Sequence, residues 1–530
     1  MRCILFFFLI SLHLLAQEKT NNNSTFFYLT DSLNSKIQLG HLKSYEQVQK
    51  KLYKEGYFYF TSELKSSKSV DSIAIDLGKR TDILAIQISS KELQKYLKTK
   101  KTEICIIPKD LDVWIEQLSS YFDEKGENFS EIKLTHQITK NDTLFCNINI
   151  NRSAKRKVDK VVIKGYHRFP KKFIKHYLHQ KKTFSKTLLR ETEKKINQLA
   201  FVKNKQKPAV LFTKDSTHLY LYLERVKANK LDALLGFSNQ GESGDFQFNG
   251  HIDIALTNTL HKGESFSFSW KNNGQEQEEI LLNLESPYVF NSPLFVGYSL
   301  NIYKQDSSFV NTQNKFLLGY QPHFKHKIST YFLAESSANI SETKNIEAYK
   351  KKHIGFIYSY KEMNEWKIPK KLLFIDIAYG VKETEQNTPQ QTIKTELIYN
   401  IPISNTHFLY LQNRNAWLGS NNKTFNELYR TGGATTMRGF LEQSIVAHLY
   451  NYSNIEYRLF TNSNSYLYGF GDVGYFKNLT QENNLLSLGL GYTFGTRGGL
   501  LKISYAVGKS NHSNFDLNTG LFHVNFVTLF

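Results

Sequence analysis

The sequence predicts a membrane all-β fold, a transmembrane β-barrel of about sixteen strands preceded by small α+β domains. From Leu231 to Phe530, apolar and polar residues alternate with a period of two, as in strands with one apolar and one polar face. The aromatic content is 14% although the mean hydropathy is only −0.43. A barrel explains this combination, because the lumen-facing side of each strand is polar and lowers the hydropathy.

The strand segments support a barrel over a soluble β-sandwich. Phe266, Phe268 and Trp270 alternate with serines, and many segments reach the roughly nine residues that a membrane-crossing strand needs. No helical pattern interrupts this run, and the number of segments is even, as bacterial barrels require. The predicted strands lie near residues 231–239, 245–257, 263–272, 276–286, 293–303, 313–321, 327–336, 349–361, 371–381, 391–400, 405–417, 445–460, 465–476, 485–494, 499–508 and 520–530.

The N-terminus predicts export. Arg2 provides a positive charge, Ile4–Leu15 is an apolar run, and Ala16 precedes polar residues. The run is too short to span a bilayer as a helix, so residues 1–16 are predicted to be a secretory signal peptide cleaved after Ala16.

Residues 17–228 predict short helices that alternate with short strands. The third unit has the clearest pattern, a strand at Val158–Lys164, a helix opened by Pro170, a second helix at Ser185–Leu199 and two further strands. An exposed strand edge in such a unit can accept an extended peptide by strand addition. The predicted organisation is a partial unit at 17–82, complete units at 83–153 and 154–228, and the barrel at 229–530.

Composition excludes several function classes. The net charge is +20 and lysines occur along the length of an exported chain, which favours anionic lipid headgroups or unfolded acidic chains over nucleic acid as partners. Once the signal peptide is removed, Cys105 and Cys146 are left, and their spacing does not establish whether they pair. The 16 histidines show no metal spacing, and no nucleophile–base motif is visible. We therefore expect no enzyme, no catalytic residue, no metal and no cofactor.

A glycine pattern at Gly469–Gly474 matches the dinucleotide-binding motif in letters only. It lies inside a predicted strand with no helix after it, so the helix N-terminus that would hold a phosphate is absent from the prediction.

The stretch Thr431–Phe440 differs from the strands on both sides. It contains Gly432 and Gly433, then Arg438, Gly439 and Phe440. Such a sequence predicts a tight loop that presents one guanidinium, here between the eleventh and twelfth strands.

Register places two acids on the inner wall near this loop. Alternation turns Glu456 inward on the strand Ala447–Phe460 and Asp472 inward on the next strand. If the loop folds into the lumen, Arg438 can form a partly buried bidentate pair with Asp472 or Glu456. The alternative is that Arg438 lies in a solvated surface loop.

These motifs resemble those of the BamA/TamA outer-membrane assembly superfamily, which includes the two-partner secretion transporters. The segment Gly432–Phe440 is similar to the superfamily's inward-folded loop, Phe470–Gly474 to the strand that receives the loop arginine, and Asn454–Arg458 to the strand between them. The N-terminal units resemble POTRA (polypeptide-transport-associated) domains. The terminal Phe530, with Phe526 and Val524 on the same strand face, resembles its barrel-terminal signal. Met437 departs from the pattern, because a smaller apolar residue is commoner there.

The resemblance implies a barrel in the cell outer membrane with POTRA-like domains in the periplasm. Its first and last strands, Leu231–Asn239 and Gly520–Phe530 here, would pair weakly and form a lateral seam. The implied partners are unfolded outer-membrane or secreted polypeptides, outer-membrane lipid and accessory lipoproteins. Three functions stay open at this point: outer-membrane protein assembly, two-partner secretion of one dedicated substrate, and a passive porin-like channel.

Overall fold

A computed structural model describes residues 26–29, 44–66, 71–178, 182–239, 246–272, 277–340, 346–364, 369–462, 465–495, 499–511 and 514–529. The predicted signal peptide and Phe530 lie outside these residues. Within the described part of the chain, no helix has both the length and the apolar character needed to cross a membrane.

The chain packs as two compact units. The first comprises residues 1–158, 181–189 and 214–217, and the second comprises residues 159–180, 190–213 and 218–530.

The first unit holds two small sheets. One has the order β1-β3-β2 and the other β5-β4-β7-β6. The elements are β1 (Phe26–Leu29), α1 (Tyr45–Lys54), β2 (Thr61–Ser66), β3 (Asp71–Asp76), β4 (Ile83–Gln87), α2 (Lys91–Tyr96), β5 (Glu103–Ile106), η1 (Pro108–Asp110), α3 (Leu111–Glu124), β6 (Glu131–Lys140) and β7 (Thr143–Asn151).

Local sequence explains the first helix. The Ser44 side chain accepts a hydrogen bond from the Gln47 backbone N–H and caps α1. Val48 and Leu52 are buried in a cluster with Ile75 of β3. Gly56 follows the helix at φ +93°, a left-handed conformation that glycine adopts without steric cost.

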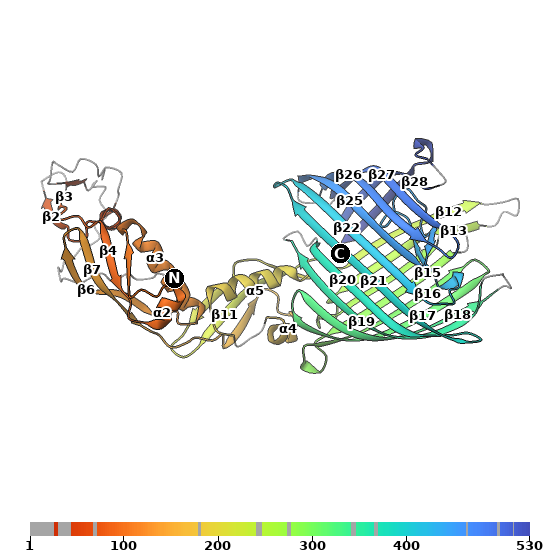
Figure 1. Cartoon of the computed structure of the whole chain (residues 1–530), viewed down its shortest axis with the longest axis horizontal. Coiled ribbons are helices and arrows are strands. Elements are labelled where there is room, and N and C mark those ends of the chain that lie inside the picture. Colours follow the sequence, from red (N-terminus) through yellow and green to blue (C-terminus); the bar gives the residue numbers. More distant parts are fainter. Residues whose placement is uncertain are drawn as a thin grey trace. The chain divides into compact units, whose positions relative to one another are not determined.

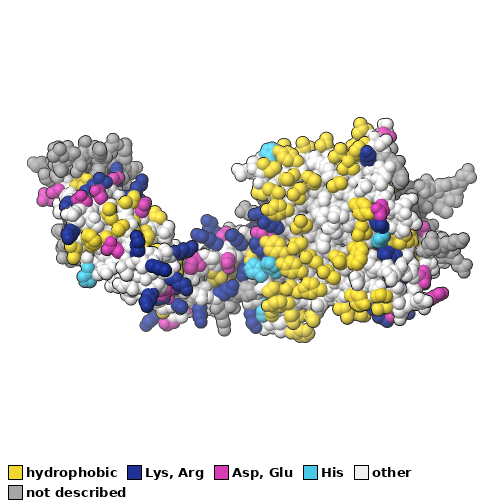
Figure 2. Space-filling view, in the orientation of Figure 1, with side chains coloured by type: hydrophobic (Ala, Val, Ile, Leu, Met, Phe, Trp, Pro, Cys, Tyr) yellow, Lys and Arg dark blue, Asp and Glu magenta, His cyan; other side chains and the backbone are white. Residues whose placement is uncertain are grey.

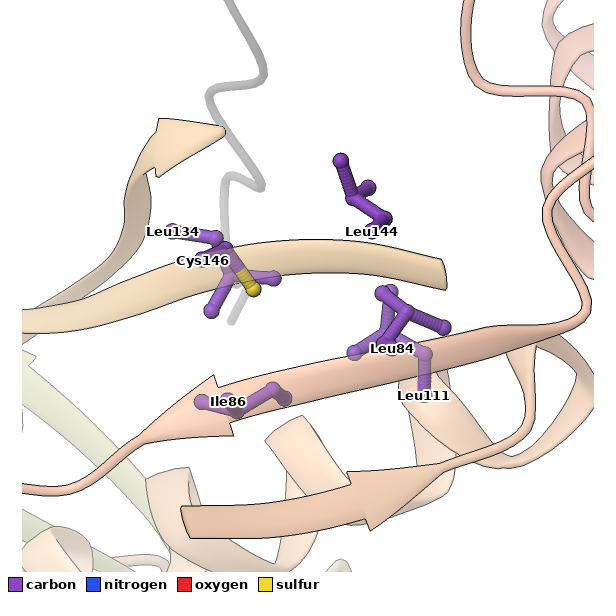
Figure 3. Close-up of a cluster of buried hydrophobic side chains, with 6 residues drawn as sticks. All are labelled: Leu84, Ile86, Leu111, Leu134, Leu144 and Cys146. Carbon is purple, nitrogen blue, oxygen red and sulfur yellow. The ribbon is translucent and has the colours of Figure 1, made fainter. Parts of the chain in front are cut away.

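The second sheet packs its core against α3 (Figure 3). The buried side chains in this view are Leu84, Ile86, Leu111, Leu134, Leu144 and Cys146. Cys146 is buried on β7, whereas Cys105 is exposed on β5, and both are free thiols. The question of pairing that the sequence left open is thus answered for this structure, in which the two cysteines do not pair.

A third sheet has the order β10-β11-β8, with β9 also paired to β11. Its elements are β8 (Lys160–Lys164), α4 (Lys171–His176), α5 (Lys186–Gln198), β9 (Val202–Asn204), β10 (Ala209–Phe212) and β11 (Thr217–Arg225). Pro170 stands at the N-cap of α4, close to its predicted place at the first helical position. Each of the three sheets falls inside one predicted segment, while the domain boundaries themselves stay predictions.

The remainder forms a closed antiparallel barrel of sixteen strands, as predicted (Figure 1). The strands are β12 (Lys230–Asn239), β13 (Phe246–Thr257), β14 (Ser265–Asn272), β15 (Gln277–Pro287), β16 (Leu294–Gln305), β17 (Phe309–His323), β18 (His326–Asn339), β19 (Tyr349–Met363), β20 (Pro369–Glu383), β21 (Asn387–Pro402), β22 (His407–Gly419), β25 (Leu449–Asn462), β26 (Ser465–Lys477), β27 (Glu482–Gly495), β28 (Gly499–Lys509) and β29 (Leu521–Leu529). Three short 3-10 helices, η2 (Val289–Asn291), η3 (Phe425–Glu427) and η4 (Leu517–Thr519), lie in its connections.

The twelfth predicted strand is wrong in one respect. Its first residues form a separate strand, β24 (Ile445–Ala447), which pairs with β23 (Tyr429–Thr431) instead of continuing the wall. The wall resumes at Leu449. Alternation alone missed this break, because the same period of two runs through both strands.

Side-chain exposure follows the predicted alternation. On β27, Leu488 and Leu490 are 52% and 68% exposed, whereas Ser487 is fully buried. Figure 2 shows hydrophobic side chains covering much of the visible outer face of the barrel. An apolar outer face and a polar inner face are what a barrel in lipid requires.

The barrel closes through a short seam. Between β12 and β29 the pairing runs over three positions, Lys230–Leu529, Leu231–Thr528 and Asp232–Val527. By contrast, β12 pairs with β13 from Lys230 to Asn239. Among the described residues, most of the β12 edge that faces β29 therefore lacks a ladder partner.

Candidate functional site

The connection between β22 and β25 folds into the lumen. It runs from residue 420 to 448 and contains η3 and the β23–β24 hairpin. Its polar side chains reach strands far apart around the wall: Asn426 donates to Ser337 on β18, and Gln443 donates to Glu279 on β15. A polar cavity of about 380 Å³ separates parts of this inward-folded loop from the wall.

Arg438 contacts both predicted acids. Its Nε lies 2.9 Å from Asp472 Oδ2, its Nη2 2.5 Å from Asp472 Oδ1, and its Nη1 2.6 Å from Glu456 Oε1. The Arg438 backbone N–H also donates to Asp472, over 3.1 Å. Asp472 is fully buried, and the Arg438 side chain is 6% exposed. The bidentate geometry matches planar guanidinium to carboxylate, and the alternative of a solvated arginine is wrong.

A second arginine extends this cluster. Arg458 Nε donates to Glu456 Oε2 over 2.7 Å, so Glu456 bridges two guanidinium groups. Arg438 also stacks 3.6 Å from the centre of the Phe470 ring. Two carboxylates facing two arginines leave no net charge in this desolvated group, which offsets part of the cost of burial. We call Arg438, Glu456, Arg458 and Asp472 the arginine anchor.

Glycine is required where the loop meets its surroundings. Gly439 has φ +79°, and a Cβ there would lie 2.7 Å from the backbone N of Gly508 on β28. Gly433 has φ +105°, and a Cβ there would overlap the carboxylate of Glu442. Gly432 also adopts a positive φ, +106°. A side chain at any of these positions would strain the backbone, and one at Gly439 would also push the loop off β28.

Two apolar residues of the motif pack inside the barrel. Met437 is fully buried beside Tyr452, Phe476 and Leu485, and Phe440 packs on the same cluster. The departure from the superfamily pattern at Met437 therefore has a physical reason, because a flexible side chain fills the space under the loop.

A second buried ion cluster holds the other end of the loop, and the sequence did not predict it. Glu427 of η3 lies 3.0 Å from Lys382 Nζ on β20 and 3.2 Å from Lys351 Nζ on β19. Gln390 on β21 donates to the same carboxylate over 2.8 Å. The side chains of Glu427 and Lys382 are fully buried. We call Glu427, Lys351, Lys382 and Gln390 the glutamate anchor.

The sequence held one signal for this second cluster. Thr424 and Glu427 form a capping box, in which each side chain accepts from the other's backbone N–H. The spacing of Thr and Glu three residues apart indicates a helix start but not its burial.

The remaining predicted residues lie at the last strand. Val524 is 58% exposed on the outer face. The β29 backbone reaches Leu529 and includes Phe526, whose side chain, like all of Phe530, lies outside what the structure describes.

One group with metal-ligand geometry occurs among the described residues, although the sequence indicated none. Possible ligand atoms of Asp232, His251 and Asp253 lie within 4.8 Å of one another on β12 and β13. His251 Nε2 lies 3.1 Å from Asp232 Oδ1, which a hydrogen bond explains without a metal.

Comparison with known proteins identifies the fold. No protein-family model matches the chain, and no curated protein matches its sequence. CdiB from Escherichia coli matches with a TM-score of 0.54 at 11% identity, over 92% of this chain and 96% of that one. CdiB from Acinetobacter baumannii matches with a TM-score of 0.53 at 14% identity, over 85% and 91%. The chain has the same fold as these two CdiB structures. A Haemophilus ducreyi BamA lacking POTRA domains 1–3 gives a TM-score of 0.48 at 13% identity, over 84% and 99%.

Within this fold, the structure brings together the loop arginine and the two acids that the sequence singled out. It also shows the short first–last strand pairing that the resemblance implied. What the structure adds is the glutamate anchor, which fixes the same loop to the wall opposite the seam: β19 and β20 are the eighth and ninth of the sixteen strands.

Proposed function

We propose that the chain is an outer-membrane transporter that assembles membrane proteins or translocates polypeptides, with its N-terminal domains in the periplasm. One observation carries this proposal. A loop anchored by Arg438 to Asp472 and Glu456 fills a barrel whose seam pairs over three positions. A client chain then has two routes. It can pass through the lumen once the polar plug is displaced, or along the edge of β12 at the weak seam.

The seam supports strand exchange on physical grounds. Unpaired backbone N–H and C=O groups on a strand edge template a new strand, and in hydrocarbon they cannot stay unpaired. A client strand that docks on the β12 edge would satisfy them, and burial of backbone and apolar surface would drive the step. The proposed role needs no cofactor and no catalytic residue. Unfolded polypeptides are the proposed clients, with outer-membrane lipid and accessory lipoproteins as further partners.

Two-partner secretion of one dedicated substrate is the second candidate. The observation that favours it is the likeness to CdiB from two organisms at TM-scores of 0.53 and 0.54. A neighbouring gene for a large secreted β-helical protein would support this candidate over general assembly.

Depletion of the protein tests the proposal. We expect the outer-membrane proteome to lose many barrels if the protein assembles them, or the culture medium to lose one secreted protein if it exports a dedicated substrate. A strain complemented with Arg438→Ala is the control. It still contains the barrel, so a defect that persists in this strain does not come from the loss of an inert pore. An unchanged proteome and secretome, together with conductance that shows a sharp small-solute cutoff, would instead establish a passive channel.

A further inference from the structure

The positive charge of the chain is concentrated in the segment that precedes the barrel. Residues 154–228 contain 21 Lys and Arg against 5 Asp and Glu, a net charge of +16 out of +20 for the whole chain. Figure 2 shows Lys and Arg side chains gathered over the segment that carries α4, α5 and β11. Such a concentration in one small domain calls for an anionic partner.

One face of α4 is packed on the barrel. The ring centres of Phe173 and Tyr288 lie 4.9 Å apart, and His176 Nε2 lies 3.2 Å from Asn291 Oδ1. Phe173 also covers Gly263, where a Cβ would lie 2.0 Å from its ring. Both contacted turns, 258–264 and 288–293, lie at the end of the barrel where β12 begins, which we call the proximal rim.

The other face of α4 presents free positive charge. Lys171, Lys172 and Lys175 are exposed. None of the three forms an ion pair within the described part of the chain, in contrast with Lys50 of α1, which pairs with Glu46. Three like charges on one exposed turn repel one another unless an outside anion neutralises them.

Two apolar side chains project from the proximal rim. Phe290 is 91% exposed and Leu260 is 68% exposed, each in one of the two turns that α4 contacts. Phe290 sits at φ 51° between Tyr288 at φ 55° and Asn291 at φ 54°. Left-handed backbone is strained at non-glycine residues, so packing of Tyr288 must hold this turn in place. The result is a phenylalanine displayed to its surroundings.

The rim combines an aromatic tip with a lysine cluster, which is the composition of a membrane interface. Aromatic rings sit at headgroup level, and clustered lysines beside a membrane segment bind anionic headgroups. An acidic polypeptide would satisfy the charge but would not account for the exposed apolar side chains of Phe290 and Leu260.

We propose that α4, through Lys171, Lys172 and Lys175, and the proximal rim, through Phe290, together bind the anionic headgroups of the adjacent leaflet. This rests on the proposed function only in that the barrel must span a bilayer. The contact holds the preceding domain against the membrane surface, which fixes where a client chain meets the barrel mouth.

The test uses the full chain in nanodiscs of phosphatidylcholine alone or mixed with phosphatidylglycerol. Hydrogen exchange of α4 and of the turn at 288–293 is the readout. We expect exchange on the order of tenfold slower with phosphatidylglycerol, reversed by high salt. K171E/K172E/K175E should abolish the difference. The matched control K95E/K100E/K101E, which makes the same charge change at exposed lysines of the second sheet's domain, should keep it. Phe290→Ser should speed exchange of the turn in both lipids.

Two results would overturn the proposal. Equal exchange in both nanodiscs, for the native chain and for K171E/K172E/K175E, would show that anionic headgroups do not bind. Protection that needs polyglutamate and ignores phosphatidylglycerol would assign the surface to an acidic polypeptide. Failure of the barrel to enter either nanodisc would be a different result, since it would contradict the proposed function itself.

Discussion

Each end of the inward-folded loop is held by a buried ion cluster, and the loop contributes a charge of opposite sign to each. At one end a loop cation, Arg438, lies between two wall acids, and at the other a loop anion, Glu427, lies between two wall lysines. The arginine anchor joins the loop to β25 and β26, and the glutamate anchor joins it to β19, β20 and β21. Lifting either end alone would leave buried charges behind, so the loop is a plug held at both ends rather than a flap on one hinge.

The chemistry of the two anchors differs in rigidity. Arg438 meets Asp472 through two parallel hydrogen bonds in a fixed plane, whereas Lys351 and Lys382 are point charges on flexible stems. Lys351 also has a second acid, Glu335, at 3.2 Å. The fork geometry therefore restricts the position of the loop at the arginine end more than the lysine point charges do at the glutamate end.

Removing both anchors should have the largest effect. We expect R438A/E427Q to give mean conductance on the order of tenfold above either single variant, because each single variant keeps the loop tethered at its other end. Planar-bilayer recordings of the four proteins measure this. Equal conductance in the double variant and in R438A would show that the glutamate anchor does not restrain the loop.

Arg438→Ala alone should lower the local stability of the loop against the wall by about 3–5 kcal/mol, because Asp472 and Glu456 would stay buried without their shared cation. Export and targeting should stay intact, while assembly activity falls and proteases reach the loop. Arg438→Lys is the matched control: it keeps the charge but not the fork, so cleavage should be intermediate. Activity and cleavage identical to wild type would remove the arginine anchor from the account.

Glu427→Gln should lower the local stability of the loop by less, about 1–3 kcal/mol. Lys382 would lose its carboxylate but keep the carbonyl of Asn422 and the hydroxyl of Thr424, at 3.1 Å each. Limited proteolysis should then cut near η3 and spare the Arg438 end. Cleavage that spreads evenly over the whole loop would mean that the two ends are not separate anchors.

Sequence reasoning found one anchor and missed the other for a definable reason. Register on two strands turned Glu456 and Asp472 inward, and the glycines and Arg438 marked the loop. Glu427 carries only the generic signal of a capping box. Its partner Lys351 lies in a run of three lysines that resembles a solvated face, although alternation points Lys351 inward and Lys352 outward to Glu383. A contact between a loop residue and strands distant in the sequence cannot be read from either segment alone.

The two cysteines should differ in reactivity, the smallest effect expected. Burial raises the pKa of the Cys146 thiol to about 11. At pH 8 only about one in a thousand of such thiols is ionised, so Cys146 should resist alkylation while exposed Cys105 reacts. Mass spectrometry after brief labelling measures this. The raised pKa also means that Cys146 favours the fold below pH 9 and loses that contribution as pH rises toward 11. Fast labelling of both thiols would contradict the packed core.

Cross-linking can establish whether the loop lies inside the lumen against the wall. The backbone carbonyl of Thr436 accepts a 2.6 Å hydrogen bond from Asn454 on β25, next to the arginine anchor. In a Cys105→Ser background, cysteines placed at Thr436 and Asn454 should be joined within one chain by a short bifunctional thiol reagent in native outer membranes. Rapid labelling of both cysteines by a soluble thiol reagent without any cross-link would show that the loop lies outside the lumen.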